Sequence, residues 1–394
     1  MQAGSVFTPS APVDQKRLFA GRTEQLHQII DAVNQKGQHV LLFGERGVGK
    51  TSLASVLAEF LQFGAVLAPK VNAIKQDTYS NVWRKVFNNI NVQFQTQGPG
   101  FNSDTKITSR PVAEEMPDPI TADDVRIQLS NLAAGHIVIV IVDEFDRLYK
   151  KEAQAFADTI KMFSDHSVPA TLVLVGVADS VGELIQAHQS VERALVQVRV
   201  PRMSPDELNE IITVGLNELG IDIEDRARTR IVHLSQGLPH YTHLLSLDAV
   251  RKALARESTT IQDSDVDASI EDAIERAQQS IKDDYHKATM SPRQDSLYPQ
   301  VLTACALAET DELGFFAAKD VRGPMSTIMQ RNYEIPAFSR HLNHFCDSRR
   351  GPVLERTGSS HRYRFRFIDP LLQPYVIMKG VSAGFISDKT LNGE

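Results

Sequence analysis

The sequence of 394 residues is poor in cysteine and has no long apolar run. Its two cysteines, Cys305 and Cys346, do not form a CxxC pair, so neither a zinc site nor a disulfide framework is predicted. So few thiols are typical of a reducing compartment, and we expect a cytoplasmic protein. No apolar stretch reaches 18 residues, so no membrane partner is expected. Residues 1–5 lack the basic and apolar parts of a secretory signal.

Basic residues are also too few to make the whole chain a polycation. Its 42 basic and 49 acidic residues give a net charge of −7, so contact with nucleic acid would need a local basic patch. With 42% hydrophobic and 23% charged residues, the composition is that of a globular protein and excludes disordered and fibrous classes. At roughly 150 residues per domain, the length predicts two or three domains.

Alternating strands and helices predict an α/β domain over residues 18–200. Residues 39–43 form a short apolar strand that runs into glycines, and a helical pattern follows over 51–60. Residues 137–142 are a continuous β-branched run, and residues 171–175 form another apolar strand. Strands that are hydrophobic on both faces are typical of a parallel sheet covered by helices, so we expect that architecture here.

Three local patterns refine this domain. Residues 1–17, rich in small, polar and proline residues, predict a flexible N-terminal tail, and Thr23 is the expected N-cap of the first helix. Residues 91–119 lack periodicity and predict an exposed insertion. Thr121 and Asp124 have the spacing of a capping box and predict a helix start.

Strand patterns stop near residue 200, where Ser204 and Pro205 predict a helix start. We expect a helical lid domain over 201–290 and a winged-helix-like domain with a tail over 291–394. The helical patterns cover 206–219, 225–235, 240–256 and 263–285. In the last domain the expected recognition-type helix covers 337–346, and the expected hairpin, or wing, covers 352–367 with its tip at 358–360.

The strongest motif lies between the first strand and the helix that follows it. Residues 44–51 read Gly-Glu-Arg-Gly-Val-Gly-Lys-Thr and match G-x-x-x-x-G-K-[ST] at every position. Backbone N–H groups of such a loop wrap phosphates, Lys50 neutralises β/γ charge, and the Thr51 hydroxyl can bind Mg²⁺. The expected cofactors are therefore ATP or ADP with Mg²⁺. The expected phosphate-binding residues are Gly44, Glu45, Arg46, Gly47, Val48, Gly49, Lys50, Thr51 and Ser52.

Two acids, Asp143 and Glu144, follow the apolar run 137–142. The carboxyl end of a buried parallel strand lies at the crevice where α/β sheets bind ligands. We expect Asp143 to hold the hydrated Mg²⁺ and Glu144 to act as the general base on the attacking water. A solvated turn after a strand is the other interpretation of this pair, and the phosphate loop makes it the weaker one.

The phosphate loop is followed by residues 142–148, which read Val-Asp-Glu-Phe-Asp-Arg-Leu. Together these two motifs resemble those of AAA+ ATPases. The similarity is to the bacterial origin-recognition and replication-initiator branch, with the related STAND-type P-loop ATPases as the near alternative, and it extends over about 18–255. It implies a P-loop AAA+ parallel-sheet domain, a helical lid and a winged-helix-like C-terminal domain. It also implies ATP hydrolysis, at a rate that the sequence leaves open.

The resemblance also implies roles for residues outside the two motifs. Residues 19–22 are similar to the family's N-terminal box, so Phe19, Gly21 and Arg22 would flank the adenine. The polar "sensor 1" residue would be Asp179, with Ser180 as second choice. Either residue could instead cap the next helix.

Two further family positions lie near the end of the α/β domain and in the lid. The arginine finger, which reaches a neighbouring subunit's γ-phosphate, would be Arg193, and Arg199 or Arg202 is the second choice. The alternative is that Arg193 forms only a surface ion pair. At the "sensor 2" position, where many members carry arginine, His240 stands here. A neutral histidine predicts weaker γ-phosphate sensing and favours the STAND branch, unless His240 is merely exposed after Pro239.

The C-terminal region carries the local basic patch. Residues 340–366 contain seven arginines and only two acids, Asp347 and Glu355, which gives a local charge of +5. Such a patch predicts contact with the phosphates of duplex DNA, and a protein-interaction module with a solvated basic face is the alternative. The expected DNA-binding residues are Arg340, Arg349, Arg350, Arg362, Arg364 and Arg366.

The sequence thus predicts an ATPase that couples ATP binding to self-association, as a homo-oligomer, and to binding duplex DNA. The alternative is a STAND-like signalling or scaffold ATPase, in a defence or mobile-element system, whose C-terminal module binds a protein effector. A small-molecule kinase is a weaker interpretation, because the helical and winged-helix-like regions leave it without an obvious substrate pocket.

Overall fold

The computed structural model describes residues 3–13, 15–60, 66–97, 105–178, 182, 189–292, 296–359 and 362–386. These residues form two compact units. The sheet unit comprises Val13–Gly44 and Lys50–Val200, and the helical unit comprises Met1–Pro12, Glu45–Gly49 and Pro201–Glu394. In the described part of the chain, no helix is both long and apolar enough to cross a bilayer.

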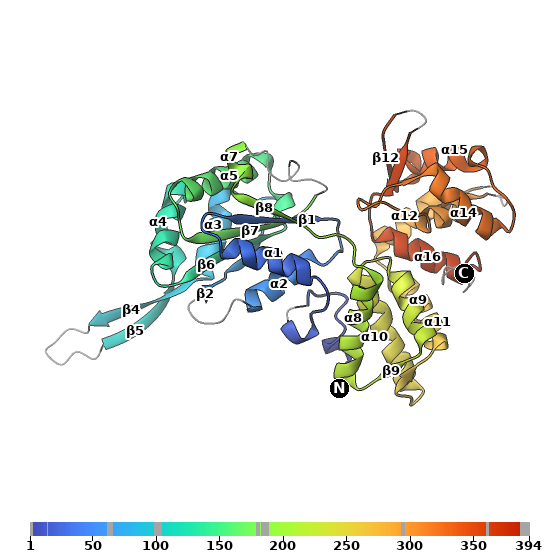
Figure 1. Ribbon diagram of the computed structural model, residues 1–394, viewed down its shortest axis with the longest axis horizontal. Helices are drawn as coiled ribbons and strands as arrows, with labels where there is room; N and C mark the ends of the chain where they lie inside the picture. The colour runs from blue at the N-terminus through green and yellow to red at the C-terminus, as the bar shows by residue number, and fades with distance from the viewer. Residues whose placement is uncertain are drawn as a thin grey trace. The chain divides into compact units, whose positions relative to one another are not determined.

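A parallel sheet forms the centre of the sheet unit (Figure 1). Its path runs β2-β6-β7-β1-β8, and β3 also pairs with β6. The strands are β1 (His39–Gly44), β2 (Val66–Leu67), β3 (Lys70–Asn72), β6 (Ile137–Asp143), β7 (Ala170–Val177) and β8 (Leu195–Arg199). The expected parallel sheet is therefore confirmed, with the strands of both motifs, β1 and β6, separated by β7.

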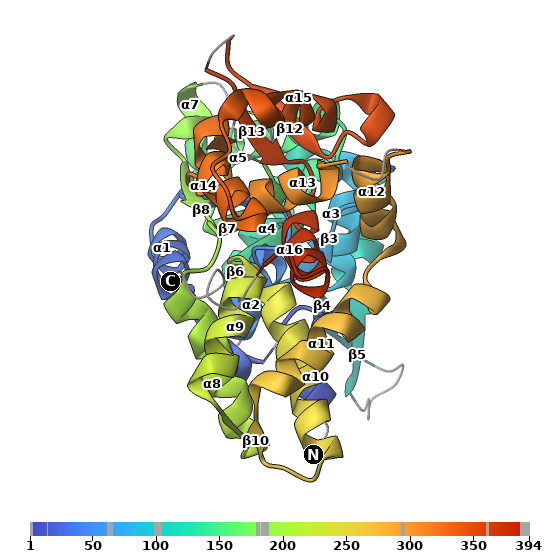
Figure 2. The ribbon, with the colours of Figure 1, turned by 90° about the vertical axis from the view of Figure 1, so that its right-hand side faces the viewer.

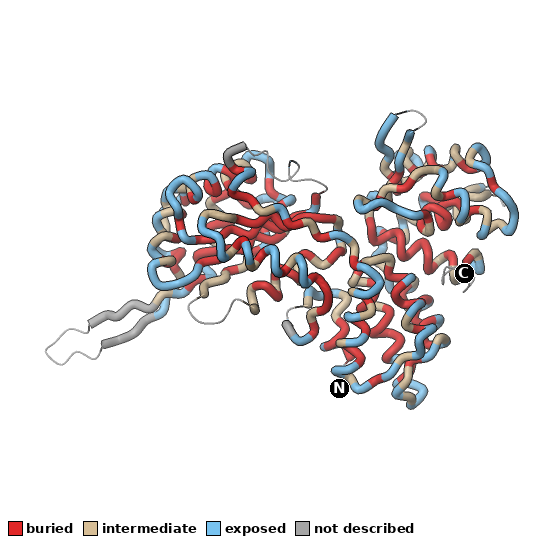
Figure 3. Tube along the Cα trace, viewed as in Figure 1, coloured by how far each residue is buried: buried red, intermediate tan, exposed pale blue. Residues whose placement is uncertain are grey.

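The β-branched run of β6 explains why the sheet is covered on both faces. Val138, Val140 and Val142 belong to the core cluster shared with α3, α4 and α5, whereas Ile139 and Ile141, equally buried, lie outside that cluster. Successive residues of a strand point to opposite faces, so the run supplies two buried faces at once (Figure 3). The helices of this unit are α1 (Thr23–Val33), α2 (Lys50–Phe60), α3 (Tyr79–Asn88), α4 (Ala122–Ala133), α5 (Lys150–Asp165) and α7 (Gln189–Glu192).

The two predicted helix starts of this unit have different outcomes. Thr121 and Asp124 form the expected reciprocal capping box at the start of α4. Thr23, expected as an N-cap, is instead the first residue of α1, and the capping position is taken by Arg22. Arg22 has φ +60° and makes no side-chain cap bond, because the chain enters the helix through a left-handed turn that already includes Gly21 at φ +69°.

The segment 91–119, expected to be irregular, contains a β-hairpin. Strands β4 (Asn91–Gln97) and β5 (Thr105–Pro111) pair antiparallel, with Asn91 opposite Pro111, and the short helix η3 (Val112–Glu115) follows. The missed signal is an alternation of period two, in which Val92 and Phe94 are separated by glutamines. The prediction that this segment lacks periodic structure is therefore wrong.

Antiparallel helices make up the first part of the helical unit. They are α8 (Pro205–Leu219), α9 (Asp225–Ser235), α10 (Pro239–Ala255), α11 (Asp263–Arg276) and α12 (Gln279–Thr289), with short parallel strands β9 (Asp222–Ile223) and β10 (Thr260–Ile261). Ser204 and Glu207 form a capping box with Pro205 at the first helical position, as the sequence predicts. The stretch 263–285, expected as one helix, breaks at Ala277 and Gln278, whose backbones are extended.

The N-terminal segment also belongs to this unit, and it is not the free tail that the sequence predicts. After the short helix η1 (Ala3–Ser5), the ring of Phe7 is almost fully buried and meets the ring of His243 edge-on, 5.9 Å between centroids. A Cβ atom on Gly215 of α8 would collide with the Phe7 ring. A glycine on a helix thus makes room for an aromatic anchor, so the segment is held by packing.

The C-terminal part has the element order of a winged helix (Figure 2). Its small antiparallel sheet has the order β11-β13-β12, and Phe316, Phe365 and Phe367 of this sheet are buried. The expected wing strands and recognition-type helix are confirmed as secondary structure. The elements are α13 (Tyr298–Ala306), β11 (Phe316–Ala317), α14 (Ala318–Met329), α15 (Ile335–Phe345), η5 (Ser348–Arg350), β12 (Leu354–Thr357), β13 (Arg364–Phe367) and α16 (Leu372–Ser382).

Candidate nucleotide-binding site

Glycines give the loop after β1 its conformation. Gly44, Gly47 and Gly49 have φ values of +152°, +85° and +93°, a region that residues with a side chain rarely adopt. A Cβ atom on Gly44 would also collide with the backbone oxygen of Val200. The motif therefore folds into the tight glycine loop that it predicts, because no other residue type fits these positions.

Two residues in the first turn of α2 form hydrogen bonds to parts of the chain that precede the helix. The buried side chain of Lys50 donates a hydrogen bond to the carbonyl of Gly44, 3.0 Å away. The hydroxyl of Ser52 accepts a bond from the amide of Val13, at 3.2 Å. Lys50 is thus held at the start of the loop, where its charge lies beside the backbone that would wrap a phosphate.

Asp143, at the end of β6, has one carboxylate oxygen that accepts no hydrogen bond. Its side chain is only 3% exposed, and its Oδ1 accepts a hydrogen bond from the amide of Glu144, at 2.8 Å. Its Oδ2 has no hydrogen-bond partner. A buried carboxylate oxygen without a hydrogen bond is costly unless a cation faces it. The hard oxygen donors of Asp143 and Thr51 fit Mg²⁺, which the fold family implies at this place.

The cation that faces Asp143 in the structure is Lys70 of β3. Its Nζ is 3.3 Å from Asp143 Oδ2 and 3.3 Å from the backbone oxygen of Thr51, and it is 2.7 Å from the hydroxyl of Ser55. One ammonium group therefore contacts both residues expected to bind magnesium, at the carboxylate of Asp143 and at the backbone oxygen of Thr51. The sequence analysis missed Lys70, because only the pairing of β3 with β6, which sets Asn72 opposite Asp143, brings it there.

Glu144 occupies an uncommon backbone conformation directly after Asp143. Its φ of +56° and ψ of 34° are left-handed, which costs a residue other than glycine on the order of 1–3 kcal/mol. It precedes the short helix η4 (Phe145–Arg147), and its carboxylate accepts a bond from Arg147 at 2.9 Å. Both side chains are partly exposed, so the ion pair is weak and can open.

The expected adenine-flanking residues lie in the same unit, and the expected sensor does not lie in the described part of the chain. Phe19 is half-buried, and Gly21 and Arg22 form the left-handed turn that leads into α1. Asp179 and Ser180, the two candidates for sensor 1, fall outside the described residues. Their assignment stays a prediction.

The three candidate arginine fingers differ in exposure. Arg193 is exposed in the turn between α7 and β8, whereas Arg199 of β8 is half-buried. Arg202 forms a largely buried ion pair with Glu45, with 2.8 Å between Nε and Oε2. Arg202 is thus already paired within its own chain, and the exposed Arg193 remains the first candidate.

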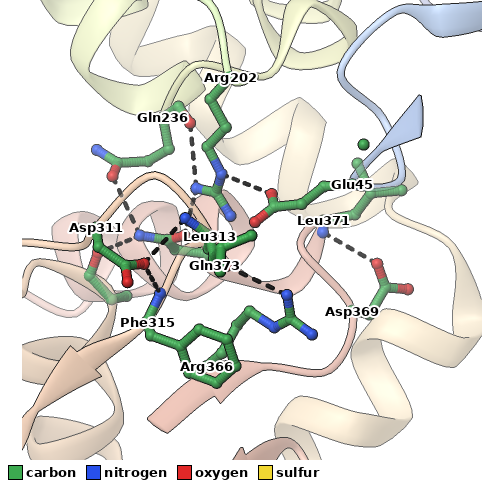
Figure 4. A network of polar contacts seen from close by, with 12 residues as sticks. Glu45, Arg202, Gln236, Asp311, Leu313, Phe315, Arg366, Asp369, Leu371 and Gln373 are labelled. Atoms are coloured by element: carbon green, nitrogen blue, oxygen red, sulfur yellow. Dashed lines mark hydrogen bonds and ion pairs between the residues drawn. The ribbon is translucent and has the colours of Figure 1, made fainter. Parts of the chain in front are cut away.

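Arg202 is the centre of a polar network in the helical unit (Figure 4). Its Nη1 donates to the side-chain oxygen of Gln373 in α16, at 2.6 Å, and to the backbone of Gln236, at 3.3 Å. Gln373 in turn donates to Gln236 Oε1 and to the carbonyl of Ala306, at 3.2 and 2.8 Å. The side chain of Glu45, a loop residue expected to contact phosphate, is thus tied to the lid segment and to the last helix.

His240 follows Pro239 at the start of α10 and is not merely exposed. Its Nδ1 is 2.7 Å from the carbonyl oxygen of Pro9, and burial lowers the pKa of its ring below the ordinary value. The ring is therefore neutral at pH 7 and donates from Nδ1 to the N-terminal segment. That bond anchors the segment that the sequence treats as a flexible tail.

Five of the six expected DNA-binding arginines make side-chain contacts within the chain. Arg364 pairs with Asp311 at 2.8 Å, and Arg366 pairs with Glu355 at 2.5 Å. Arg349 pairs with Asp347, and Arg350 donates to the carbonyls of Ala288 and Met290 and lies over the ring of Tyr298. Arg340 is exposed and donates from Nε to Nε2 of His344, at 3.4 Å, and Arg362 is exposed as well. The local charge is thus partly neutralised by neighbouring acids, including Asp311, which lies outside the window used for the charge count.

The comparison with protein families agrees with the glycine loop and the acids at the end of β6. Residues 11–329 match the model of the family described as Novel STAND NTPase 1. The chain belongs to the novel STAND NTPase 1 family. Of the two branches that the sequence resembles, the STAND branch is therefore the one to which this P-loop NTPase is assigned.

Solved structures resemble this STAND NTPase in fold at low sequence identity. A Walker-type ATPase of Pyrococcus abyssi is 14% identical with a TM-score of 0.51, over 93% of this chain and 98% of that one. The Aeropyrum pernix ORC2 protein, solved with ADPNP and ADP, is 15% identical with a TM-score of 0.49, over 94% and 99%. The ORC1 protein of the same organism, solved with DNA, is 14% identical with a TM-score of 0.47, over 98% of each chain.

Proposed function

We propose that this STAND NTPase is an ATPase that binds ATP with Mg²⁺ and uses its hydrolysis to reset a molecular switch. One observation carries this proposal. Asp143 ends β6 with a buried carboxylate oxygen that accepts no hydrogen bond, and it lies across a single ammonium group from the first turn of α2. A carboxylate and a helix start at the edge of a parallel sheet, beside a glycine loop, are the arrangement that binds a nucleotide triphosphate with its metal.

Each residue of the site has a distinct role in this proposal. Backbone amides of the glycine loop bind phosphate oxygens, and Lys50 neutralises the charge on the β- and γ-phosphates. Thr51 and Asp143 would hold Mg²⁺, which supplies positive charge to the leaving phosphates when bound. Glu144 takes the proton of the attacking water once its ion pair with Arg147 opens.

The remaining positions follow the same proposal. Phe19, Gly21 and Arg22 flank the adenine, and Asp179 serves as sensor 1. His240 stands at the sensor 2 position, but its Nδ1 already bonds to Pro9, so its influence on γ-phosphate passes through the N-terminal segment.

Substituting the loop lysine tests nucleotide binding directly. The variant Lys50→Ala should lose binding of ADP and ATP, because the positive charge beside the glycine loop is removed. The measurement is isothermal titration of the purified protein with each nucleotide and Mg²⁺. Lys36→Ala, an exposed lysine just before β1, is the matched control and should bind like the parent. Equal affinity of the Lys50 variant and the parent would refute the proposed site.

The winged-helix-like domain is proposed to bind the partner of the switch, and we favour a protein effector over duplex DNA. The internal pairing of Arg364 with Asp311 and of Arg366 with Glu355 supports this preference, because charges already neutralised add little to phosphate binding. Arg340 and Arg362, which are exposed and make no ion pair with an acid in the described residues, would support the DNA alternative. A mobility shift of duplex DNA that weakens steeply with salt would reverse the preference.

A further inference from the structure

Lys70 lies where the magnesium ligands of the proposed site meet. Its Nζ is surrounded by oxygen atoms of Asp143, Thr51 and Ser55, at 3.3, 3.3 and 2.7 Å. These oxygens come from two elements, the end of β6 and the first turns of α2, and both belong to the sheet unit with β3. The lysine side chain is 20% exposed, so its charge is only partly screened by water.

The ammonium group compensates a carboxylate oxygen, Oδ2 of Asp143, that would otherwise be buried without a partner. Asp143 Oδ2 accepts no hydrogen bond, and its ion pair in the structure is with Lys70. Leaving such a carboxylate uncompensated is strongly destabilising. A divalent cation at the same oxygen would supply the compensation in place of Lys70, and the two positive charges would repel each other.

We infer that Lys70 is a resident counter-ion of Asp143 that competes with Mg²⁺ for this carboxylate. Lys70 is a positioning residue, and its charge sets the Mg²⁺ concentration at which the nucleotide-bound state forms. The inference rests on the proposed function. It adds that the charge of Lys70 determines how much Mg²⁺ the site requires. Ser55 and the Thr51 carbonyl hold the ammonium group when Asp143 turns to the metal.

Another lysine of the sheet unit makes a similar pair, and it also donates to the backbone oxygen of Asn72, at 3.3 Å. Lys85 of α3 lies 2.5 Å from the buried carboxylate of Asp77, and the same oxygen of Asp77 also accepts a bond from the amide of Ile74. That carboxylate therefore keeps a backbone donor when the lysine is removed. Lys85 is the matched control, because its removal also breaks a lysine–aspartate pair in the same unit.

The test compares Lys70→Met with Lys85→Met by thermal unfolding of the full chain. The midpoint of unfolding is followed at saturating ADP while Mg²⁺ is added stepwise. Without Mg²⁺, both variants should melt below the parent. With Mg²⁺, the midpoint of the Lys70→Met variant should rise further than the parent's, and half of the rise should need about tenfold less Mg²⁺, since one repelling charge is gone. The Lys85→Met variant should need as much Mg²⁺ as the parent.

The outcomes separate this inference from the proposed function. If Lys70→Met and Lys85→Met respond to Mg²⁺ alike, or if the Lys70→Met protein stays unfolded even with ADP and Mg²⁺, Lys70 is structural and the inference fails. Lys70→Arg keeps the charge and should retain the parent's Mg²⁺ requirement; a response like that of the methionine variant would refute the role of charge. If the parent gains no stability from ADP at all, the proposed function itself fails, and the inference with it.

Discussion

Glu144 keeps a backbone conformation that few residues other than glycine adopt, directly beside Asp143 at the end of β6. We expect Glu144→Gln to bind ATP like the parent, because the amide has nearly the shape of the carboxylate. Hydrolysis should fall about 10²- to 10⁴-fold, since glutamine cannot accept a proton from water at pH 7. Phosphate release and nucleotide binding are measured on the same preparation. Glu114→Gln, an exposed acid of η3, serves as the control, and hydrolysis at the parent's rate in Glu144→Gln would remove the general-base role.

Single residues were predictable where spacing along the chain defines them. Lys50 and Thr51 follow from the glycine motif, and Asp143 follows from its place after an apolar strand. The ion pairs of Lys70 and Arg202 were not predictable, because their partners, Asp143 and Glu45, are remote in the sequence and meet them only through strand pairing and the tertiary fold. A sequence shows that a residue is basic, but it does not show which acid neutralises its charge.

At the scale of an element, His39 joins two strands through its ring as well as its backbone. It begins β1, it is fully buried, and its Nδ1 accepts a hydrogen bond from the amide of Leu172 in β7, at 3.1 Å. Burial lowers its pKa to about 4, below the ordinary 6.5. The folded state therefore needs the neutral ring, whereas the unfolded chain binds a proton below pH 6.5. The contribution of the neutral ring to stability is fully present above pH 6.5. As the pH falls toward 4, the free energy of unfolding drops by about 1.4 kcal/mol for each pH unit.

His39→Gln should reduce this loss, because glutamine can accept the same bond and does not titrate. The midpoint of thermal unfolding is measured between pH 7.5 and about pH 4.5 for both proteins. The variant's midpoint should fall less steeply than the parent's, and the exposed His27→Gln control should follow the parent. His243, whose pKa burial also lowers to about 4, keeps part of the slope in every variant. Equal slopes in the parent and His39→Gln would mean that His39 does not limit stability in acid.

Elements were predictable where one signal dominated. The β-branched run of β6 and the capping boxes at Thr121 and Ser204 gave correct elements. The hairpin of β4 and β5 was missed, because its alternation is carried by glutamine and threonine beside few apolar residues. The break between α11 and α12 was missed as well, since Ala277 and Gln278 are common helix residues and only their extended backbones separate the two helices.

At the scale of the whole molecule, the open question is whether ATP brings copies of this STAND NTPase together. Arg193 is exposed beside β8, and we propose that this first candidate for the arginine finger reaches the γ-phosphate of a neighbouring copy. Light scattering should report a larger mass for the parent with ATP and Mg²⁺ than without them. Arg193→Ala should lower hydrolysis by about a thousandfold or more, since the finger's charge acts on the transition state.

The control decides between a specific finger and a general effect of surface charge. Lys161→Ala removes an exposed cation from α5 of the same unit, and it should leave both mass and hydrolysis at the parent's values. If Arg193→Ala hydrolyses ATP as fast as this control, the finger is assigned to the wrong residue. If the parent's mass does not change with ATP, each copy must complete its own site. Residues of the same chain would then have to supply the charge that we assign to Arg193, and Arg202 is already paired with Glu45.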